Sequence, residues 1–118
     1  MWFSKFNYDP FVKFGNWLNW TAMGLGHHEF DLRAADLAEF SNLTNYGLLM
    51  CNMKQNEMDK TQINFKDSKI VEINRTKVGT IGYVTSQTSN MTASNLPTLT
   101  FLDVLESVRK EAQRLKSS

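Results

Sequence analysis

Residues 61–86, TQINFKDSKIVEINRTKVGTIGYVTS, contain three runs of β-branched and alternating side chains. The runs are 62–65, 69–73 and 78–85, and two short polar segments separate them, one around Asp67 and one formed by residues 74–77. This spacing predicts a three-stranded antiparallel meander. Three strands with one apolar face need a helix to cover them. The rest of the chain must therefore supply helices, and the expected fold class is α+β.

The helix that can cover the meander follows it in the sequence. From residue 101 to about 116 the apolar side chains recur at helical spacing, and Thr100 with Asp103 resembles a capping box. The apolar positions are Phe101, Val104, Leu105, Val108, Ala112 and Leu115. We expect this side of an amphipathic C-terminal helix to pack on the sheet.

Residues 86–100, between the meander and this helix, form an uncharged segment rich in Ser, Thr and Asn. Loops of such length are uncommon in compact domains and are often functional, unless they contain a further strand. A solvated loop is one interpretation. The other is a loop that orders against a neighbouring subunit, because the absence of charge lowers the cost of desolvation. Met91 and Leu96 are then interface candidates.

Two helical stretches are expected before the meander. Asp9 followed by Pro10 is typical of a helix start, and the first helix should run from Pro10 to about Met23, with glycines at 24 and 26 as stops. A second stretch, from Asp31 to about Gln55, shows an apolar stripe that includes Cys51. Weak helix formers from Ser41 onward leave open whether this middle stretch is one kinked helix or two.

Aromatic residues are concentrated at the N-terminus, where residues 1–30 hold nine of the fourteen. Large rings need a core, a partner or a membrane interface. Helical spacing favours a core position for Phe11, Phe14 and Leu18. The candidates for an interface are Trp2, Phe3, Trp17 and Trp20.

Charge and cysteine content exclude several classes of protein. Lys plus Arg is 13 and Asp plus Glu is 12, so the net charge of +1 argues against nucleic acid as the main partner. Cys51 is the single cysteine, so no internal disulfide can form, and a reducing compartment follows. No secretory signal is apparent, which predicts a cytoplasmic or virion location. No cofactor is expected.

One cluster could carry chemistry, and it lies at residues 27–31. His27 and Asp31, or His28 and Asp31, could share a helical face. These three residues are weak metal candidates, because zinc catalysis needs three ligands in defined geometry and a linker with polar caps explains the same residues. Cys51 is expected to be a small buried thiol rather than a nucleophile. The sequence therefore predicts that the chain is not an enzyme.

The favoured interpretation is a single domain, residues 1–118, that acts as a non-enzymatic structural or assembly subunit. Interface cores are rich in aromatic residues and poor in charge, which describes both unusual segments. A homo-oligomer or a larger protein assembly follows, and the composition suits a small phage virion or accessory protein. Two alternatives remain open. One is a membrane-surface protein that uses the aromatic N-terminal helix, and the other is a small metal-binding enzyme centred on residues 27–31.

Overall fold

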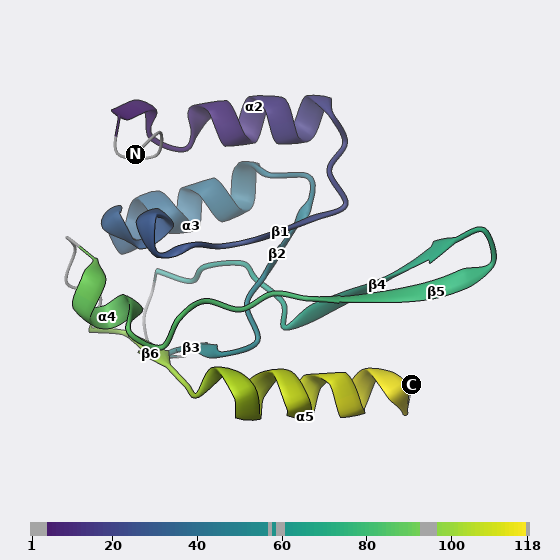
Figure 1. Ribbon diagram of the computed structural model, residues 1–118. Helices are drawn as coiled ribbons and strands as arrows, with labels where there is room; N and C mark the ends of the chain where they lie inside the picture. Colours follow the sequence, from purple (N-terminus) through teal and green to yellow (C-terminus); the bar gives the residue numbers. More distant parts are fainter. Residues whose placement is uncertain (1–4, 57, 59–60, 93–96, 118) are drawn as a thin grey trace.

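The computed structural model describes residues 5–56, 58, 61–92 and 97–117. These residues form a mixture of helices and short strands, in agreement with the α+β class (Figure 1). In chain order the elements are α2 (Asp9–Trp17), β1 (Ala22–Gly24), the 3-10 helix η1 (His27–Asp31), α3 (Ala34–Leu43), β2 (Gly47–Leu49), β3 (Met53–Gln55), β4 (Ser68–Ile73), β5 (Thr76–Ile81), α4 (Thr88–Met91), β6 (Leu99–Phe101) and α5 (Val104–Lys116).

The described strands pair in three small sheets. β1 runs parallel to β2, β3 runs antiparallel to β6, and β4 and β5 form an antiparallel hairpin. Figure 1 shows α2 and α3 on one side of the β1–β2 pair and α5 on the opposite side of the molecule, while the β4–β5 hairpin extends away from the body. The parallel pair is thus the centre of the fold.

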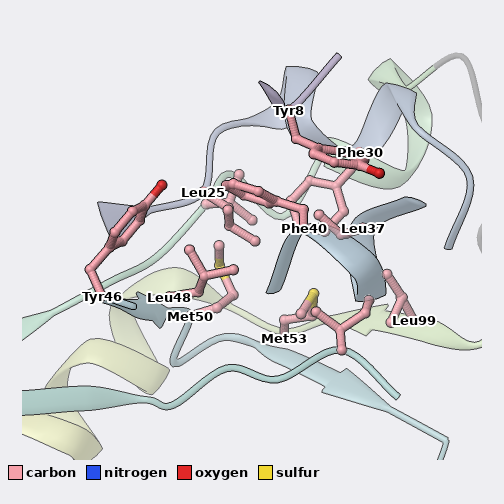
Figure 2. Packing of buried hydrophobic residues seen from close by; sticks show 12 residues of the cluster. Tyr8, Leu25, Phe30, Leu37, Phe40, Tyr46, Leu48, Met50, Met53 and Leu99 are labelled. Carbon is pink, nitrogen blue, oxygen red and sulfur yellow. The ribbon is translucent and has the colours of Figure 1, made fainter. Parts of the chain in front are cut away.

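The core gathers buried side chains from η1, α3, β2, β3, β6 and the loops between them, and residues of α2 and β1 pack against it (Figure 2). Two ring contacts connect distant segments: Tyr8 stacks on Phe40 at 6.0 Å between ring centroids, and Phe30 meets Phe101 edge to face at 5.1 Å. Burying such rings is the main favourable contribution to folding. The buried apolar residues of this cluster are Tyr8, Leu25, Phe30, Leu37, Phe40, Tyr46, Leu48, Met50, Met53, Ile63, Val84 and Leu99.

The first helix begins one residue before the predicted Pro10 and ends six residues before the expected end at Met23. It stops at Trp17, and Asn19 adopts a positive φ of 52°, a conformation that breaks the helix and that Asn tolerates. Ala22 and Met23, expected to be helical, and Gly24, expected to be a helix stop, pair instead with β2. Phe11 packs against the core, whereas Phe14 and Leu18 are exposed, so their predicted core position is wrong.

The middle stretch is neither one kinked helix nor two. Helix α3 ends at Leu43, and the next residue, Thr44, is already extended. The amide of Asn45 is bound by the side chain of Asn16, and the chain then forms β2 and β3. Cys51 follows β2 and is half-buried, so its placement on a helical stripe is also wrong. The weak helix formers in 41–47 mark the end of the helix rather than a kink.

The expected meander has two strands in place of three. Residues 62–65 form no strand, because the side-chain amide of Gln55 takes the two backbone hydrogen bonds of Ile63, each at 2.9 Å. The hairpin of β4 and β5 is present, with Asn74 and Arg75 at its turn, both at positive φ. Such residues give a turn whose twist suits a two-residue hairpin.

The C-terminal helix packs beside β5 as expected, but its start differs from the prediction. Asp103 is the N-cap and accepts a hydrogen bond from the Glu106 amide at 2.8 Å, while Thr100 belongs to β6. Leu105, expected on the buried side, is exposed. The uncharged segment before it contains α4 and leads into β6, so the loop hides a further strand.

Gly82 is the position where a small side chain is needed most. Its carbonyl accepts a hydrogen bond from the Cys51 amide at 2.8 Å, and a Cβ at Gly82 would lie 2.1 Å from the carbonyl oxygen of Leu49. We expect Gly82→Ala to lower the free energy of unfolding by about 2–3 kcal/mol, because backbone must shift to relieve the overlap. Urea unfolding of the full chain measures this.

Gly47→Ala is the matched control for this prediction. A Cβ at Gly47 would meet only ordinary contacts, the nearest being Lys69 Cδ at 3.8 Å. Its unfolding free energy should stay within about 0.5 kcal/mol of the parent. Equal effects of the two substitutions would refute a close approach at Gly82.

Candidate functional site

The turn that follows β1 carries the candidate metal-binding or catalytic side chains of residues 27–31. Leu25 is buried, Gly26 is extended, and η1 then covers His27–Asp31. This turn lies at the carboxyl end of β1, which runs parallel to β2. In α/β sheets, ligands bind in the crevice outside the carboxyl ends of parallel strands. Residues 26–31 are therefore the candidate site on this chain.

Two buried side chains hold η1 in place. The Glu29 carboxylate accepts a hydrogen bond from the Gly26 amide at 2.5 Å, and the Phe30 ring is fully buried against Phe101. Burial raises the pKa of Glu29, because the charged form loses hydration, while the bond from Gly26 opposes that effect. With Glu29 and Phe30 fixed inside, the short helix has a defined orientation.

The two histidines of η1 are more accessible than these anchors. Nδ1 of His28 lies 2.9 Å from Oδ2 of Asp31, with 53% of the His28 side chain and 20% of the Asp31 side chain exposed. The ring of His27 lies 4.2 Å from that of His28, centroid to centroid. A carboxylate on one ring nitrogen favours the tautomer that leaves the other nitrogen for a ligand. His28 can therefore act as an oriented acid, base or ligand.

The weak metal candidates are only partly assembled. His28 and Asp31 are brought together, and the ring of His27 lies next to that of His28, tilted by 38°. Among the described residues, no group of three or more His, Cys, Asp or Glu side chains could hold a metal ion. In the described part of the chain, this site thus has an imidazole and its carboxylate partner but not a complete set of metal ligands.

A second polar cluster connects α5 to the hairpin, and the sequence analysis missed it. Arg114 donates two hydrogen bonds to the buried Glu111 carboxylate, at 2.8 and 2.6 Å, and Ser68 donates to the same carboxylate. These bonds hold the pKa of Glu111 below its usual range. The signal in the sequence was the position of Glu111 between Val108 and Ala112, on the side of the helix expected to be buried.

The Glu111 cluster makes stability pH-dependent. A lowered folded-state pKa means that the carboxylate stabilises the fold above its ordinary pKa of 4.5 and stops doing so as pH falls through the folded-state value. We expect Glu111→Gln to cost about 1 kcal/mol at pH 7, a modest value because Arg114 is largely solvated. Unfolding of both proteins at pH 7 and pH 3 tests this: the difference should shrink in acid, and a constant difference would contradict it.

Cys51 lies in a groove next to this cluster. The groove has a volume of about 510 Å³ and is lined by Cys51, Asp67, Lys110, Glu111 and Arg114, among others. Burial and the nearby Asp67 raise the pKa of the Cys51 thiol. A raised pKa disfavours the thiolate, so the environment gives no activation of a nucleophile.

The three interface candidates that the structure describes, Trp17, Trp20 and Met91, do not form one surface. Trp17 is 78% exposed at the end of α2, Trp20 is partly covered by Tyr46, and Met91 is half exposed in α4. Figure 1 shows α4 on the side of the molecule away from the C-terminal end of α2. Trp2, Phe3 and Leu96 lie outside the described residues. No helix in the described part of the chain is long and apolar enough to span a bilayer.

The chain is similar in sequence to proteins named 5′-nucleotidase. It is 35% identical over 118 residues to the snake venom 5′-nucleotidase of Gloydius brevicauda, and the match covers 98% of this chain and 20% of the relative. It is 28% identical to the 5′-nucleotidase of Diplobatis ommata, covering 99% of this chain and 21% of the relative. The chain therefore spans about a fifth of the length of these relatives. No family model matches it.

The chain is also similar to a solved structure of a 5′-nucleotidase. The 5′-nucleotidase precursor of Thermus thermophilus superposes with a TM-score of 0.87 and 28% identity, covering 98% of this chain and 23% of that one. The calcineurin-like phosphoesterase YfkN of Bacillus subtilis shares the fold, with a TM-score of 0.71 at 23% identity, covering 98% of this chain and 40% of that one.

These similarities correct the functional interpretation drawn from composition. The relatives are named as enzymes, so the predictions of a structural or virion protein and of a non-enzyme are wrong. The aromatic content led to the wrong class of protein because it shows that large apolar side chains need burial, but not whether a core, a partner or a membrane interface buries them. The expected homo-oligomer, the absence of nucleic acid as a partner and the cytoplasmic location stay predictions.

Proposed function

We propose that this chain is a segment of a 5′-nucleotidase and contributes to removal of the 5′-phosphate from nucleotides. The observation that carries the proposal is the 35% identity to a snake venom 5′-nucleotidase across 98% of this chain. Similarity over almost the whole chain, and not over one short motif, supports a shared role for the segment. The fold similarity to the Thermus thermophilus 5′-nucleotidase precursor supports it independently.

The geometry at η1 suits this reaction. Hydrolysis of a nucleoside 5′-monophosphate joins a water oxygen to phosphorus, breaks the bond from phosphorus to O5′ and leaves a proton on O5′. An imidazole whose pKa is near the working pH is a good source of that proton. His28 is exposed and held by Asp31 at 2.9 Å, at the carboxyl end of β1. We assign it the role of proton donor to the leaving oxygen.

The fixed backbone around η1 supports this role. Proton transfer depends on placing the donor within hydrogen-bond reach of the leaving group. The anchors Glu29 and Phe30 keep η1 from moving, and Asp31 sets the orientation of the imidazole. The buried Glu29 thus has a structural part, and His28 the chemical one.

A chimera tests the proposed function. Residues 1–118 replace the superposed segment of the Thermus thermophilus 5′-nucleotidase, and release of inorganic phosphate from AMP is measured. The folded chimera should hydrolyse AMP well above the background of buffer. A folded chimera that is inactive, when the unmodified host is active in the same assay, would contradict the proposal. ADP and NAD in parallel assays show which phosphate linkage is cleaved.

A further inference from the structure

The turn of the β4–β5 hairpin carries a sequence that can be covalently modified. Residues 74–76 are Asn-Arg-Thr, which matches the acceptor pattern for N-linked glycosylation: Asn, any residue except Pro, then Ser or Thr. The attached oligosaccharide is bulky, so an acceptor has to lie on the surface. The same pattern occurs at Asn19, Asn42 and Asn90, and all four asparagines are exposed. Their surroundings in the fold distinguish them.

Two of the four acceptor patterns are held by helices. Asn42 belongs to α3 and Asn90 to α4, and the threonines that complete the two patterns, Thr44 and Thr92, are half-buried. The Thr44 hydroxyl also donates a hydrogen bond to the Ser41 carbonyl, at 3.3 Å. A transferase that binds the whole tripeptide therefore finds the hydroxyl side of these patterns partly covered.

The third pattern, at Asn19, lies in a packed turn after α2. The ring of Trp20, its middle residue, meets the ring of Tyr46 at 5.5 Å between centroids. The carbonyl of Thr21, its last residue, accepts a hydrogen bond from the Lys69 ammonium at 2.7 Å. Contacts with the body of the protein thus involve two of the three residues.

The pattern at residues 74–76 is accessible along its whole length. Asn74, Arg75 and Thr76 are all exposed, at the end of a hairpin that extends away from the body of the molecule (Figure 1). Asn74 and Arg75 have φ values of 50° and 64°, a left-handed conformation that Asn tolerates. A glycan is attached to the side-chain amide, so this backbone conformation suits the modified residue as well as the free one.

The same turn is exposed to proteases. Arg75 and Lys77 are basic residues of the kind after which trypsin-like proteases cut, and both are exposed. Exposed loop tips are preferred sites of proteolytic nicking. A bulky group on Asn74 lies directly beside both of these bonds in the sequence, so it would obstruct a protease that approaches the turn.

We infer that Asn74 is the acceptor of an N-linked glycan that shields the hairpin turn. The transfer joins Nδ2 of Asn74 to C1 of an N-acetylglucosamine and breaks the bond from that carbon to a diphosphate. The donor is thus a lipid-diphosphate oligosaccharide of the secretory pathway. The diphosphate leaves with the bonding electron pair, and the amide nitrogen gives up one proton to solvent.

The relatives support such a route through the cell. The Gloydius brevicauda 5′-nucleotidase is named as a venom protein, and venom is a secreted fluid. A glycan on this chain would therefore replace the cytoplasmic location predicted from the sequence. The inference concerns a modification at the hairpin, so it does not depend on the reaction proposed for His28.

Secretion of the full chain from insect cells, behind a cleavable leader, tests the site. Peptide N-glycosidase removes an N-linked glycan and converts its asparagine to aspartate, so mass spectrometry of the treated protein should find aspartate at position 74. Thr76→Val should abolish this conversion, because it removes the hydroxyl of the pattern and keeps the β-branched shape that suits a strand. Thr76→Ser keeps the pattern and should keep the glycan.

Thr80→Val is the matched control. It makes the same substitution at an exposed position of β5, outside any acceptor pattern, and should leave the glycan at position 74 in place. Trypsin should cut after Arg75 or Lys77 at least about 10-fold more slowly in this control than in Thr76→Val. Equal rates of cutting, or unmodified Asn74 in the secreted chain, would overturn the inference.

The protein isolated from its natural source tests the route. Aspartate at position 74 after the same glycosidase treatment would support the inference, and unmodified asparagine there would overturn it. Phosphate release by the chimera is a separate measurement. An inactive chimera therefore contradicts only the proposed function, and an unmodified Asn74 contradicts only this inference.

Discussion

Asn52→Leu is expected to lower the free energy of unfolding of this chain by about 4 kcal/mol, because each buried backbone group left without a partner costs roughly 1–3 kcal/mol. The Asn52 side chain is fully buried. It accepts from the Val84 amide at 3.0 Å and donates to the carbonyls of Val84 and Leu102, at 2.8 and 3.1 Å. One amide thereby joins the end of the central parallel pair to two distant segments.

Urea unfolding measures this cost, and two variants define its origin. Asn42→Leu is the matched control, since Asn42 is exposed in α3, and its effect should stay within about 0.5 kcal/mol. Asn52→Asp keeps an acceptor for the Val84 amide but cannot donate when ionised. Burial should raise the pKa of the new carboxyl group, so this variant should regain stability as pH falls. Similar losses for Asn42→Leu and Asn52→Leu would remove the basis of the prediction.

The parts of the fold that could be predicted are those whose signals are local. Asp9 and Pro10 mark the start of the first helix, and the runs 69–73 and 78–85 with the polar break between them indicate the two strands of the β4–β5 hairpin. The amphipathic pattern after Asp103 gives the last helix. Each of these signals depends on neighbours within four residues, so the sequence alone contains it.

The central parallel pair could not be found in this way. β1 and β2 have three residues each, too few to show alternation, and their apolar residues also fit a helical period. The partners of Asn52 are 32 and 50 residues away in the chain. Such long-range contacts override local helical preference, which is why residues 47–55 were expected to be helical.

The candidate site was visible only in part. The histidines and Asp31 stood out as a cluster, but their value as a site depends on where the turn lies. The same residues would be expected in a linker with polar helix caps and in a turn at the carboxyl end of a parallel strand. The pairing of β1 with β2 distinguishes them, and that pairing joins residues 22–24 to residues 47–49.

The site gives the largest expected effect on activity. In the chimera, His28→Gln should lower kcat/KM for AMP by about 10²–10⁴, the usual contribution of a positioned general acid or base. Glutamine keeps a polar group of similar reach but cannot give up a proton near neutral pH. Release of inorganic phosphate from AMP by the folded chimera and its variant measures the effect. Arg109→Gln, on an exposed position of α5, is the control and should be fully active.

Asp31→Asn separates chemistry from orientation at this site. Asp31 touches His28 at 2.9 Å, so as a positioning residue it should affect activity less than His28 itself, by about 10- to 100-fold, a range typical of groups that orient another ligand or base. The readout is therefore the size of the two losses. Near-parent activity in His28→Gln, or a loss in Asp31→Asn as large as that in His28→Gln, would remove this pair from the mechanism.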